Sequence, residues 1–178
     1  MALKATIHKA ELEIVDMDRN YYATHRLTLA CHPSETAERL MIRLLAFALN
    51  AHERLEFGKG ISDSDEPDLW QKDLAGGIEL WIELGHPDEK VIARAVGRSP
   101  RVIVYTYSAN PDRWWDPIGH RFEKEKKLSV FHVDAASARE LAGLADSSMN
   151  LQCSVQDGEV WFRDDRENAV RVEMERAR

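Results

Sequence analysis

Two acidic residues in the middle third of the chain, Asp68 and Glu83, are of types that could do chemistry together. They lie in segments 68–73 and 78–84, where apolar and polar residues alternate, and the sequence Leu74-Ala75-Gly76-Gly77 separates the two segments. Such alternation on either side of a glycine-rich turn predicts two antiparallel strands joined as a hairpin. If the loop holds an even number of residues, Asp68 lies directly opposite Glu83 on one face.

Opposed carboxylates require a physical explanation. Directly opposed residues have Cβ atoms about 4.5–5.5 Å apart, and like charges at that distance are destabilising. A proton shared by the two acids would remove the repulsion. A hard cation such as Mg²⁺, which prefers oxygen ligands, would do so as well. The third interpretation is that both acids are solvated at the rim of the sheet, and an odd loop would place them on opposite faces.

The same register has consequences for the neighbouring side chains. It places Trp70 opposite Trp81 and Lys72 opposite Glu79, on the face that carries the two acids. A stacked or edge-on tryptophan pair and an ion pair are therefore expected beside the carboxylates.

Length and charge limit the classes of function. A chain of 178 residues is within the usual size of one domain, so we expect a single domain, 1–178. Its formal net charge of −7 argues against general affinity for duplex nucleic acid, which is bound by neutralising phosphates with Lys and Arg. A local basic strip stays compatible with this charge, so a nucleic-acid partner remains a hypothesis.

The sequence also predicts a cellular location. It holds no run near the ~20 apolar residues of a membrane span, and its start alternates apolar and polar residues, unlike a signal peptide. Cys31 and Cys153 are far apart and form no Cys-x-x-Cys motif, which indicates reduced thiols and no disulfide framework. We therefore expect a cytoplasmic monomer that does not contact a membrane; a protein partner cannot be identified.

The elements that must position the acids follow from periodicity. Segments 3–15 and 21–30 predict an N-terminal β-hairpin, and an apolar stripe from Ala37 to Ala48 predicts a helix capped by Ser34. Segment 86–96 has helical spacing and precedes the apolar run Val102–Tyr107. A strand, a helix and a buried strand in that order imply a right-handed parallel crossover.

The last third of the chain predicts more strands. Leu128–Val133 is typical of a strand, and Asp134 can cap a helix that runs to Ala145. Asp157-Gly158 is the strongest signal for a short hairpin and predicts a C-terminal one. A final strand is expected around Val170. The predicted fold class is α/β, of mixed α+β type.

Several long segments resemble the bacterial YaeQ family along nearly the whole chain. The matching segments are HKAELEIVDMDRNYYATH, HPSETAERLMIRLLAFALNA, LEFGKGISDSDEPDLWQKDL, IELWIELGHPDEK, VIVYTYS, the Trp114-Trp115 pair and LQCSVQDGEVWF. The family is uncharacterised, and its fold is similar to a compact variant of the PD-(D/E)XK nuclease-like core. This resemblance implies a restriction-endonuclease-like α-β-β-β-α-β core with N-terminal and C-terminal β-hairpins.

The resemblance also implies a role for individual residues. It places the motif's Pro-Asp at Pro67-Asp68 and its second acid at Glu83. In such nucleases the two acids and a backbone carbonyl, here that of Leu84, hold Mg²⁺ or Mn²⁺. Glu38 occupies the position that supplies an extra acid in some members, although a solvated side chain on the first helix is the simpler interpretation.

The chain departs from the motif at the lysine. The resemblance requires a lysine two residues after Glu83, and Gly85 stands there. Lys90 or Lys72 could replace it from a neighbouring element. The sequence Pro87-Asp88-Glu89-Lys90 imitates the motif without a gap, but the motif's acids come from two adjacent strands, and Pro, Asp and Glu are typical of a helix start. We interpret the adjacent His86 as a helix-capping or solvated residue.

Three interpretations of function follow. The first is a divalent-metal-dependent nuclease in which Asp68 and Glu83 are ligands and Lys90 stabilises charge. The second is a catalytically inactive relative that serves as a regulatory module and binds nucleic acid or protein through the same cleft. The third is an interaction protein in which both acids are structural.

Overall fold

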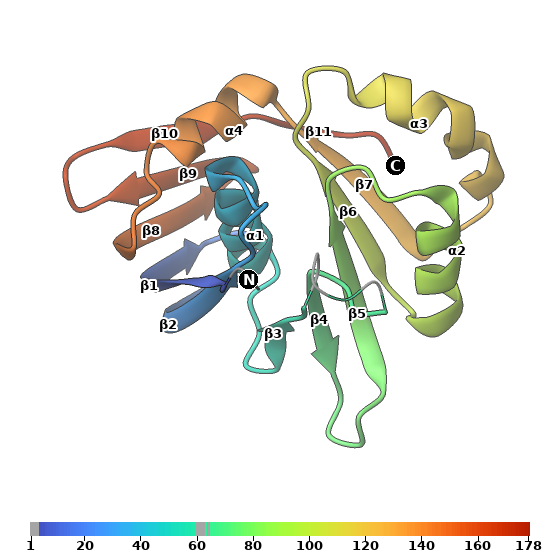
Figure 1. Cartoon of the computed structure of the whole chain (residues 1–178), viewed down its shortest axis with the longest axis horizontal. Helices are drawn as coiled ribbons and strands as arrows, with labels where there is room; N and C mark the ends of the chain where they lie inside the picture. The colour runs from blue at the N-terminus through green and yellow to red at the C-terminus, as the bar shows by residue number, and fades with distance from the viewer. Residues whose placement is uncertain (1–3, 60–62, 64) are drawn as a thin grey trace. The chain divides into compact units, whose positions relative to one another are not determined.

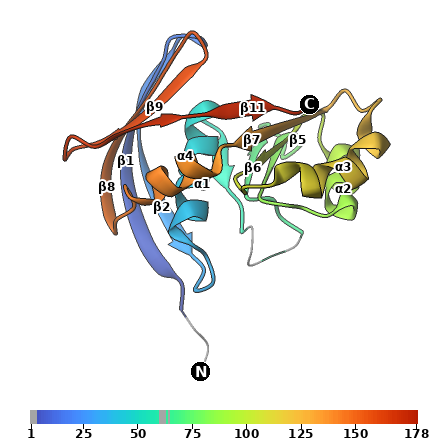
Figure 2. The ribbon, with the colours of Figure 1, turned by 90° about the horizontal axis from the view of Figure 1, so that it is seen from above.

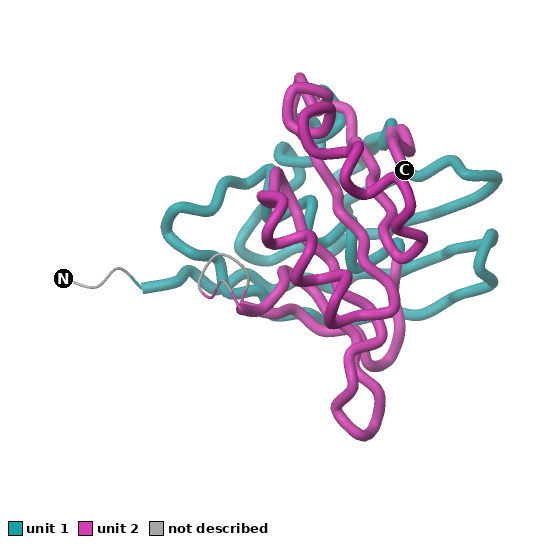
Figure 3. The backbone as a smooth tube through the Cα atoms, turned by 90° about the vertical axis from the view of Figure 1, so that its right-hand side faces the viewer, with its two compact units in different colours: residues 1–49, 136–173 teal, residues 50–135, 174–178 magenta. Residues whose placement is uncertain are grey.

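The computed structural model describes residues 4–59, 63 and 65–178 of the protein. The chain forms two compact units (Figure 3): unit 1 holds Met1–Leu49 and Ala136–Glu173, and unit 2 holds Asn50–Ala135 and Met174–Arg178. The backbone therefore leaves unit 1, returns to it, and ends in unit 2. That the whole chain behaves as one domain stays a prediction.

Unit 1 is built on a mixed five-stranded sheet. Its strands, in spatial order, are β10 (Ala169–Val172), β9 (Glu159–Asp164), β8 (Ser148–Gln156), β1 (Thr6–Asp16) and β2 (Tyr21–Cys31). The pair β1 and β8 is parallel and the other neighbours are antiparallel. Both predicted hairpins, the N-terminal and the C-terminal one, are confirmed.

The turns of the two hairpins are hydrogen-bonded to each other. The Asp18 carboxylate accepts the N–H groups of Asp157 and Gly158, each at 2.8 Å. These two residues have φ values of +51° and +77°, as a tight two-residue hairpin turn requires. Residue type and spacing were sufficient to predict this turn, whereas its partner Asp18 lies 139 positions away in the sequence.

Two helices, α1 (Ala37–Leu49) and α4 (Ala135–Ala142), lie on the same face of this sheet (Figures 1 and 2). The predicted cap of α1 was wrong. Thr36, not Ser34, accepts the Arg39 N–H at 3.1 Å, and Ser34 is hydrogen-bonded to His32. Serine and threonine are both preferred at helix N-caps, so residue type alone could not choose between them.

Unit 2 is built on a mixed six-stranded sheet. Its strands, in spatial order, are β11 (Met174–Arg176), β7 (Leu128–Val133), β6 (Val102–Thr106), β5 (Ile78–Leu84), β4 (Leu69–Lys72) and β3 (Leu55–Phe57). Strands β3, β4 and β5 form an antiparallel meander. Strands β5, β6 and β7 are mutually parallel, as predicted for the first two. The mixed α+β fold class is therefore confirmed.

Helices close one face of the unit 2 sheet. Helix α2 (Glu89–Arg98) connects β5 to β6, and α3 (Pro111–Gly119) with the short 3₁₀ helix η2 (His120–Phe122) connects β6 to β7 (Figure 1). The core beneath them contains Trp81, Ile92, Ala95, Val102, Val104, Phe122, Leu128 and Val130. Trp114 and Trp115 of α3 are partly buried and pack against this core.

The predicted register of β4 and β5 is confirmed at Trp70 and Trp81 but is wrong at Lys72. Trp70 pairs with Trp81, and their rings meet edge to face at 6.0 Å. The register then shifts between Gln71 and Lys72, so Lys72 lies opposite Ile78 instead of Glu79. The Lys72 ammonium lies 3.7 Å from the centroid of the Trp70 ring.

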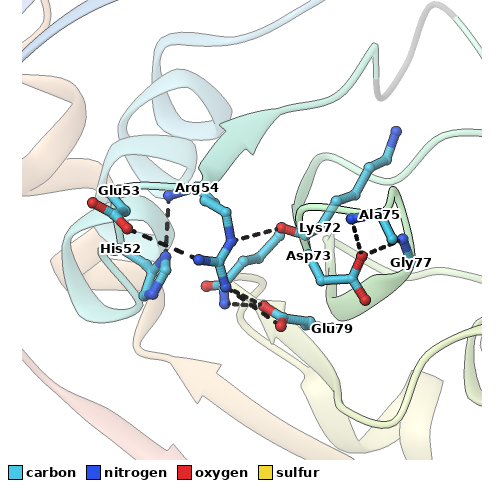
Figure 4. Close-up of polar contacts among 9 residues, drawn as sticks. His52, Glu53, Arg54, Lys72, Asp73, Ala75, Gly77 and Glu79 are labelled. Carbon is cyan, nitrogen blue, oxygen red and sulfur yellow. Dashed lines mark hydrogen bonds and ion pairs between the residues drawn. The ribbon is translucent and has the colours of Figure 1, made fainter.

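Arg54 organises the polar groups around this irregularity (Figure 4). Its Nε donates to the Lys72 carbonyl at 2.9 Å, and its Nη2 donates to the Glu79 carboxylate at 3.1 Å. Gln71 also donates to Glu79, at 2.7 Å. The pKa of Glu79 is held below its usual value, mainly by the hydrogen bond from Gln71 and next by that from Arg54. Arg54 thus takes the partner that the sequence assigned to Lys72.

The Arg54 contacts lead to a prediction about stability. Arg54→Lys removes the planar fork that reaches Lys72 and Glu79 together. We expect the free energy of unfolding to fall by about 1 kcal/mol, the net value of a typical lost hydrogen bond, in urea denaturation followed by tryptophan fluorescence. Arg113→Lys, at an exposed residue of α3, is the control. Equal effects of the two substitutions would contradict this role for Arg54.

Candidate functional site at the carboxyl edge of unit 2

The carboxyl ends of β5, β6 and β7 meet at one edge of the unit 2 sheet, because these strands are parallel. The start of β4 lies at the same edge, since β4 is antiparallel to β5. We call this region the carboxyl edge; it comprises Asp68, residues 83–86, residues 106–108 and His132. Open α/β sheets bind ligands at this end of their strands.

Asp68 is held to β5 by both its backbone and its side chain. It immediately precedes β4 and is only 3% exposed. Its N–H donates to the Ile82 carbonyl at 3.1 Å, and its carboxylate Oδ2 accepts the Leu84 N–H at 2.9 Å. The carboxylate therefore satisfies a backbone donor of β5 and is fixed in position by it.

Glu83 lies on the neighbouring strand and is half-buried. Its Oε1 accepts the indole N–H of Trp81 at 2.8 Å, so both side chains occupy the same face of β5. The pairing of β4 with β5 begins at Leu69 and Ile82, and the Asp68 N–H also donates to Ile82, so a position of Asp68 directly opposite Glu83 stays a prediction. In the part of the chain that the structure describes, no three or more His, Cys, Asp or Glu side chains are arranged to hold a metal. Metal binding by this pair stays a prediction.

Gly85 has a backbone reason to be glycine. Its φ is +86°, in the left-handed region, and its N–H donates to the Tyr105 carbonyl at 2.8 Å. A side chain with a Cβ costs roughly 1–2 kcal/mol in this conformation. Lysine at position 85 would therefore be strained.

The other proposed site residues lie as follows. Lys90 is exposed and is the second residue of α2. That helix begins after Asp88, which caps it by accepting the Val91 N–H at 3.0 Å. The cap is therefore not His86. The segment Pro87-Asp88-Glu89-Lys90 is a helix start, as predicted. Glu38 is a half-buried residue in the first turn of α1, in unit 1. Roles for Lys90 and Glu38 beside Asp68 and Glu83 stay predictions.

The sequence patterns did not show that His86, just after the end of β5, would contact residues that follow β6. His86 stacks on Trp114, with ring centroids 5.3 Å apart and planes 4° from parallel. Its Nε2 is hydrogen-bonded to the Ser108 hydroxyl at 2.9 Å. Trp114 in turn donates its indole N–H to the Pro87 carbonyl at 2.8 Å, which fixes the ring on which His86 rests.

His132 is the most unusual polar residue at this edge. It is 8% exposed, and its Nδ1 is hydrogen-bonded to the buried Thr106 hydroxyl at 2.6 Å. Its Nε2 is buried and has no hydrogen-bond partner among the described residues. Desolvation lowers the pKa of His132, while the carboxylates of Asp112 and Glu175 act in the opposite direction. Alternation along Leu128–Val133 could have revealed that His132 points inward with Leu128 and Val130.

Comparison with known proteins assigns the family. The model of the YaeQ protein family matches residues 1–174. The chain belongs to the YaeQ family. It is 43% identical over 169 residues to the uncharacterized protein YaeQ of Escherichia coli K12, covering 94% of this chain and 93% of that protein. The Salmonella typhi YaeQ protein is 44% identical over the same length.

Solved YaeQ structures share the fold. The crystal structure of YaeQ from Xanthomonas axonopodis pv. citri has a TM-score of 0.94 at 44% identity and covers 98% of both chains. That of YaeQ from Pseudomonas syringae has a TM-score of 0.93 at 32% identity, covering 98% of this chain and 96% of that one. None of the helices in the described residues is long and apolar enough to span a membrane, and cytoplasmic location stays a prediction.

The Asp68 hydrogen bond leads to a stability prediction. Asp68→Ala leaves the buried Leu84 N–H without its acceptor, which costs roughly 1–3 kcal/mol. Asp68→Asn keeps an acceptor oxygen, so we expect a clearly smaller loss in urea denaturation. Asp116→Ala, at an exposed residue of α3, should change little. Equal losses for the Ala and Asn variants at position 68 would show that the hydrogen bond contributes nothing.

A second prediction concerns pH. The folded-state pKa of His132 is lowered, so the unfolded chain binds more protons as pH falls below about 6.5. The stability gained from a neutral His132 is therefore complete above that pH and is lost on acidification toward the folded pKa. Relative to His132→Asn, wild type should lose stability between pH 7.5 and pH 5 in thermal unfolding. A stability difference between wild type and His132→Asn that does not change with pH would contradict this.

Proposed function

We propose that the protein is a divalent-metal-dependent phosphodiesterase of the nuclease-like kind, in which Asp68 and Glu83 bind Mg²⁺ or Mn²⁺. The observation that carries this proposal is the position of the two acids. The Asp68 carboxylate accepts the N–H of Leu84, the residue after Glu83, so both acids lie at the carboxyl edge. Placing two carboxylates together incurs electrostatic repulsion that a cation would remove.

The donor set is compatible with Mg²⁺. Two carboxylates and the Leu84 carbonyl are hard oxygen donors, and Mg²⁺ typically keeps several waters and takes only one or two protein carboxylates. A bound cation supplies activated water and neutralises charge that develops on the phosphate. The protein's own part is to hold Asp68 rigid through β5 and to orient Glu83 through the Trp81 indole.

The order of elements adds support. From α1 to β6 the chain runs helix, strand, strand, strand, helix, strand, which is the order that the resemblance to the nuclease-like core implied. The proposed substrate is therefore a nucleic-acid phosphodiester.

Two observations favour a second candidate function, a catalytically inactive module that binds nucleic acid or protein. The left-handed backbone at Gly85 disfavours the motif lysine at that position, and both carboxylates already have structural hydrogen bonds. In this alternative the carboxyl edge would bind its partner without cleaving it.

Cleavage assays test the first candidate directly. With Mn²⁺ or Mg²⁺, wild type should cleave single- or double-stranded DNA or RNA, and Asp68→Asn and Glu83→Gln should lower the rate at least 100-fold, roughly 3 kcal/mol of transition-state stabilisation. Lys90→Ala should lower the rate sharply if Lys90 stabilises the developing charge. Lys126→Ala, which removes an exposed lysine near η2, is the matched control.

Calorimetry separates the two candidates. Wild type should bind Mn²⁺ and Asp68→Asn should not, whereas Asp116→Asn should bind it as wild type does. Cleavage that survives Asp68→Asn would point to another site or a contaminant. Absence of both metal binding and cleavage by purified wild type would overturn the metal-dependent proposal and leave the binding module.

A further inference from the structure

The lysine position of the motif lies in one cross-strand row with Thr106 and His132. Leu84 pairs with Tyr105 on β6, so Gly85 is level with Thr106, and Thr106 pairs with His132 on β7. Within β6, Thr106 shares the face of Val102 and Val104; within β7, His132 shares that of Leu128 and Val130. At about 4.8 Å per strand, His132 is roughly 10 Å from β5.

The contacts of Thr106 indicate which nitrogen of His132 carries the proton. Thr106 is fully buried, and the only side-chain hydrogen bond described for its hydroxyl is to Nδ1 of His132. A buried hydroxyl with a single partner is best satisfied by donating its proton to that partner. Nδ1 is then the acceptor, and Nε2 of the neutral ring carries the hydrogen. An unpaired buried donor of this kind carries a desolvation penalty unless something accepts from it.

We propose that the Nε2–H of His132 binds an oxygen of a phosphate group at the carboxyl edge. This inference deepens the proposed function and rests on it for the source of the group, a phosphodiester near the one bound by the cation at Asp68 and Glu83. His132 thereby provides a hydrogen-bond donor for the phosphate in the cross-strand row where Gly85, which has no side chain, cannot provide one.

The start of α3 favours an anion over a neutral acceptor. Asn110 precedes the helix and makes no side-chain capping hydrogen bond, so the first N–H groups of α3 are not capped by that side chain. Such groups attract phosphate oxygens. Asp112, in the first turn of α3, is close enough to influence the charge of His132.

Two negative charges near His132 oppose an anion and provide a test. Asp112 lies on α3, and Glu175 lies opposite His132 on β11. Both carboxylates should weaken phosphate binding, so removing the charge of either one should strengthen it. A purely structural role for His132 predicts no such effect.

In the experiment, wild type and each variant are titrated with inorganic phosphate and, separately, with a dinucleotide phosphodiester. Both titrations contain EDTA and are followed by NMR through the backbone amide signals of the carboxyl edge. The two ligands distinguish free phosphate from a nucleic-acid source. At position 132, asparagine keeps an acceptor for Thr106 near the place of Nδ1 but has no group at Nε2, and glutamine reaches the place of Nε2. His132→Asn should weaken binding at least tenfold, the effect of losing one hydrogen bond to a charged group, and His132→Gln should retain most of it.

His120→Asn, at an exposed residue of η2, is the control and should bind phosphate as wild type does. If His132→Asn fails to fold, Asp112→Asn should strengthen phosphate binding several-fold. No binding of either ligand by wild type at millimolar concentration, or unchanged binding in His132→Asn, would overturn the inference. EDTA removes metal, so phosphate binding is measured independently of the proposed cation. Phosphate binding without any cleavage would contradict only the proposed function. Cleavage without phosphate binding at His132 would contradict only this inference.

Discussion

The parallel pairing of β5 with β6 and of β6 with β7 is the constraint on which the rest of unit 2 depends. Trp81, Val102, Val104, Leu128 and Val130 are buried on one face of these strands, and a slip by one residue would turn them to the other face. The register that protects this core also brings Glu83, Thr106 and His132 to one face. The register of these strands therefore determines both the packing of the core and the positions of the candidate site residues.

The carboxyl edge combines structural and chemical duties in the same side chains. Asp68 completes the hydrogen bonding of β5, and Glu83 satisfies the indole of the most buried tryptophan, Trp81. Both carboxylates therefore have structural duties besides the proposed binding of a cation. These duties mean that loss of activity in an alanine variant would be ambiguous, which is why amide substitutions are the informative ones.

Gly85 shows how the backbone can limit a motif. A left-handed φ ends β5 with a hydrogen bond to Tyr105 and disfavours any side chain there. The charge or donor that a lysine would provide must then come from another element. Lys90 on α2, which is exposed, and His132 on β7, which is buried and hydrogen-bonded to Thr106, are the two sources that we propose.

Residue types and their spacing were enough to predict the two hairpins, the start of α2, the parallel strands and the pairing of Trp70 with Trp81. Periodicity and turn chemistry carry this information because they act between residues that are near in the sequence. The sequence also determined the family. The contact of Glu79 with Arg54 instead of Lys72 could be seen only in the structure, because the register shifts after Gln71 and Arg54 is 25 positions from Glu79 in the sequence. The tertiary structure likewise brought His86 to Ser108 and Thr106 to His132, pairs separated by 22 and 26 positions. Contacts between strands so far apart follow from sheet order, which a single sequence does not specify.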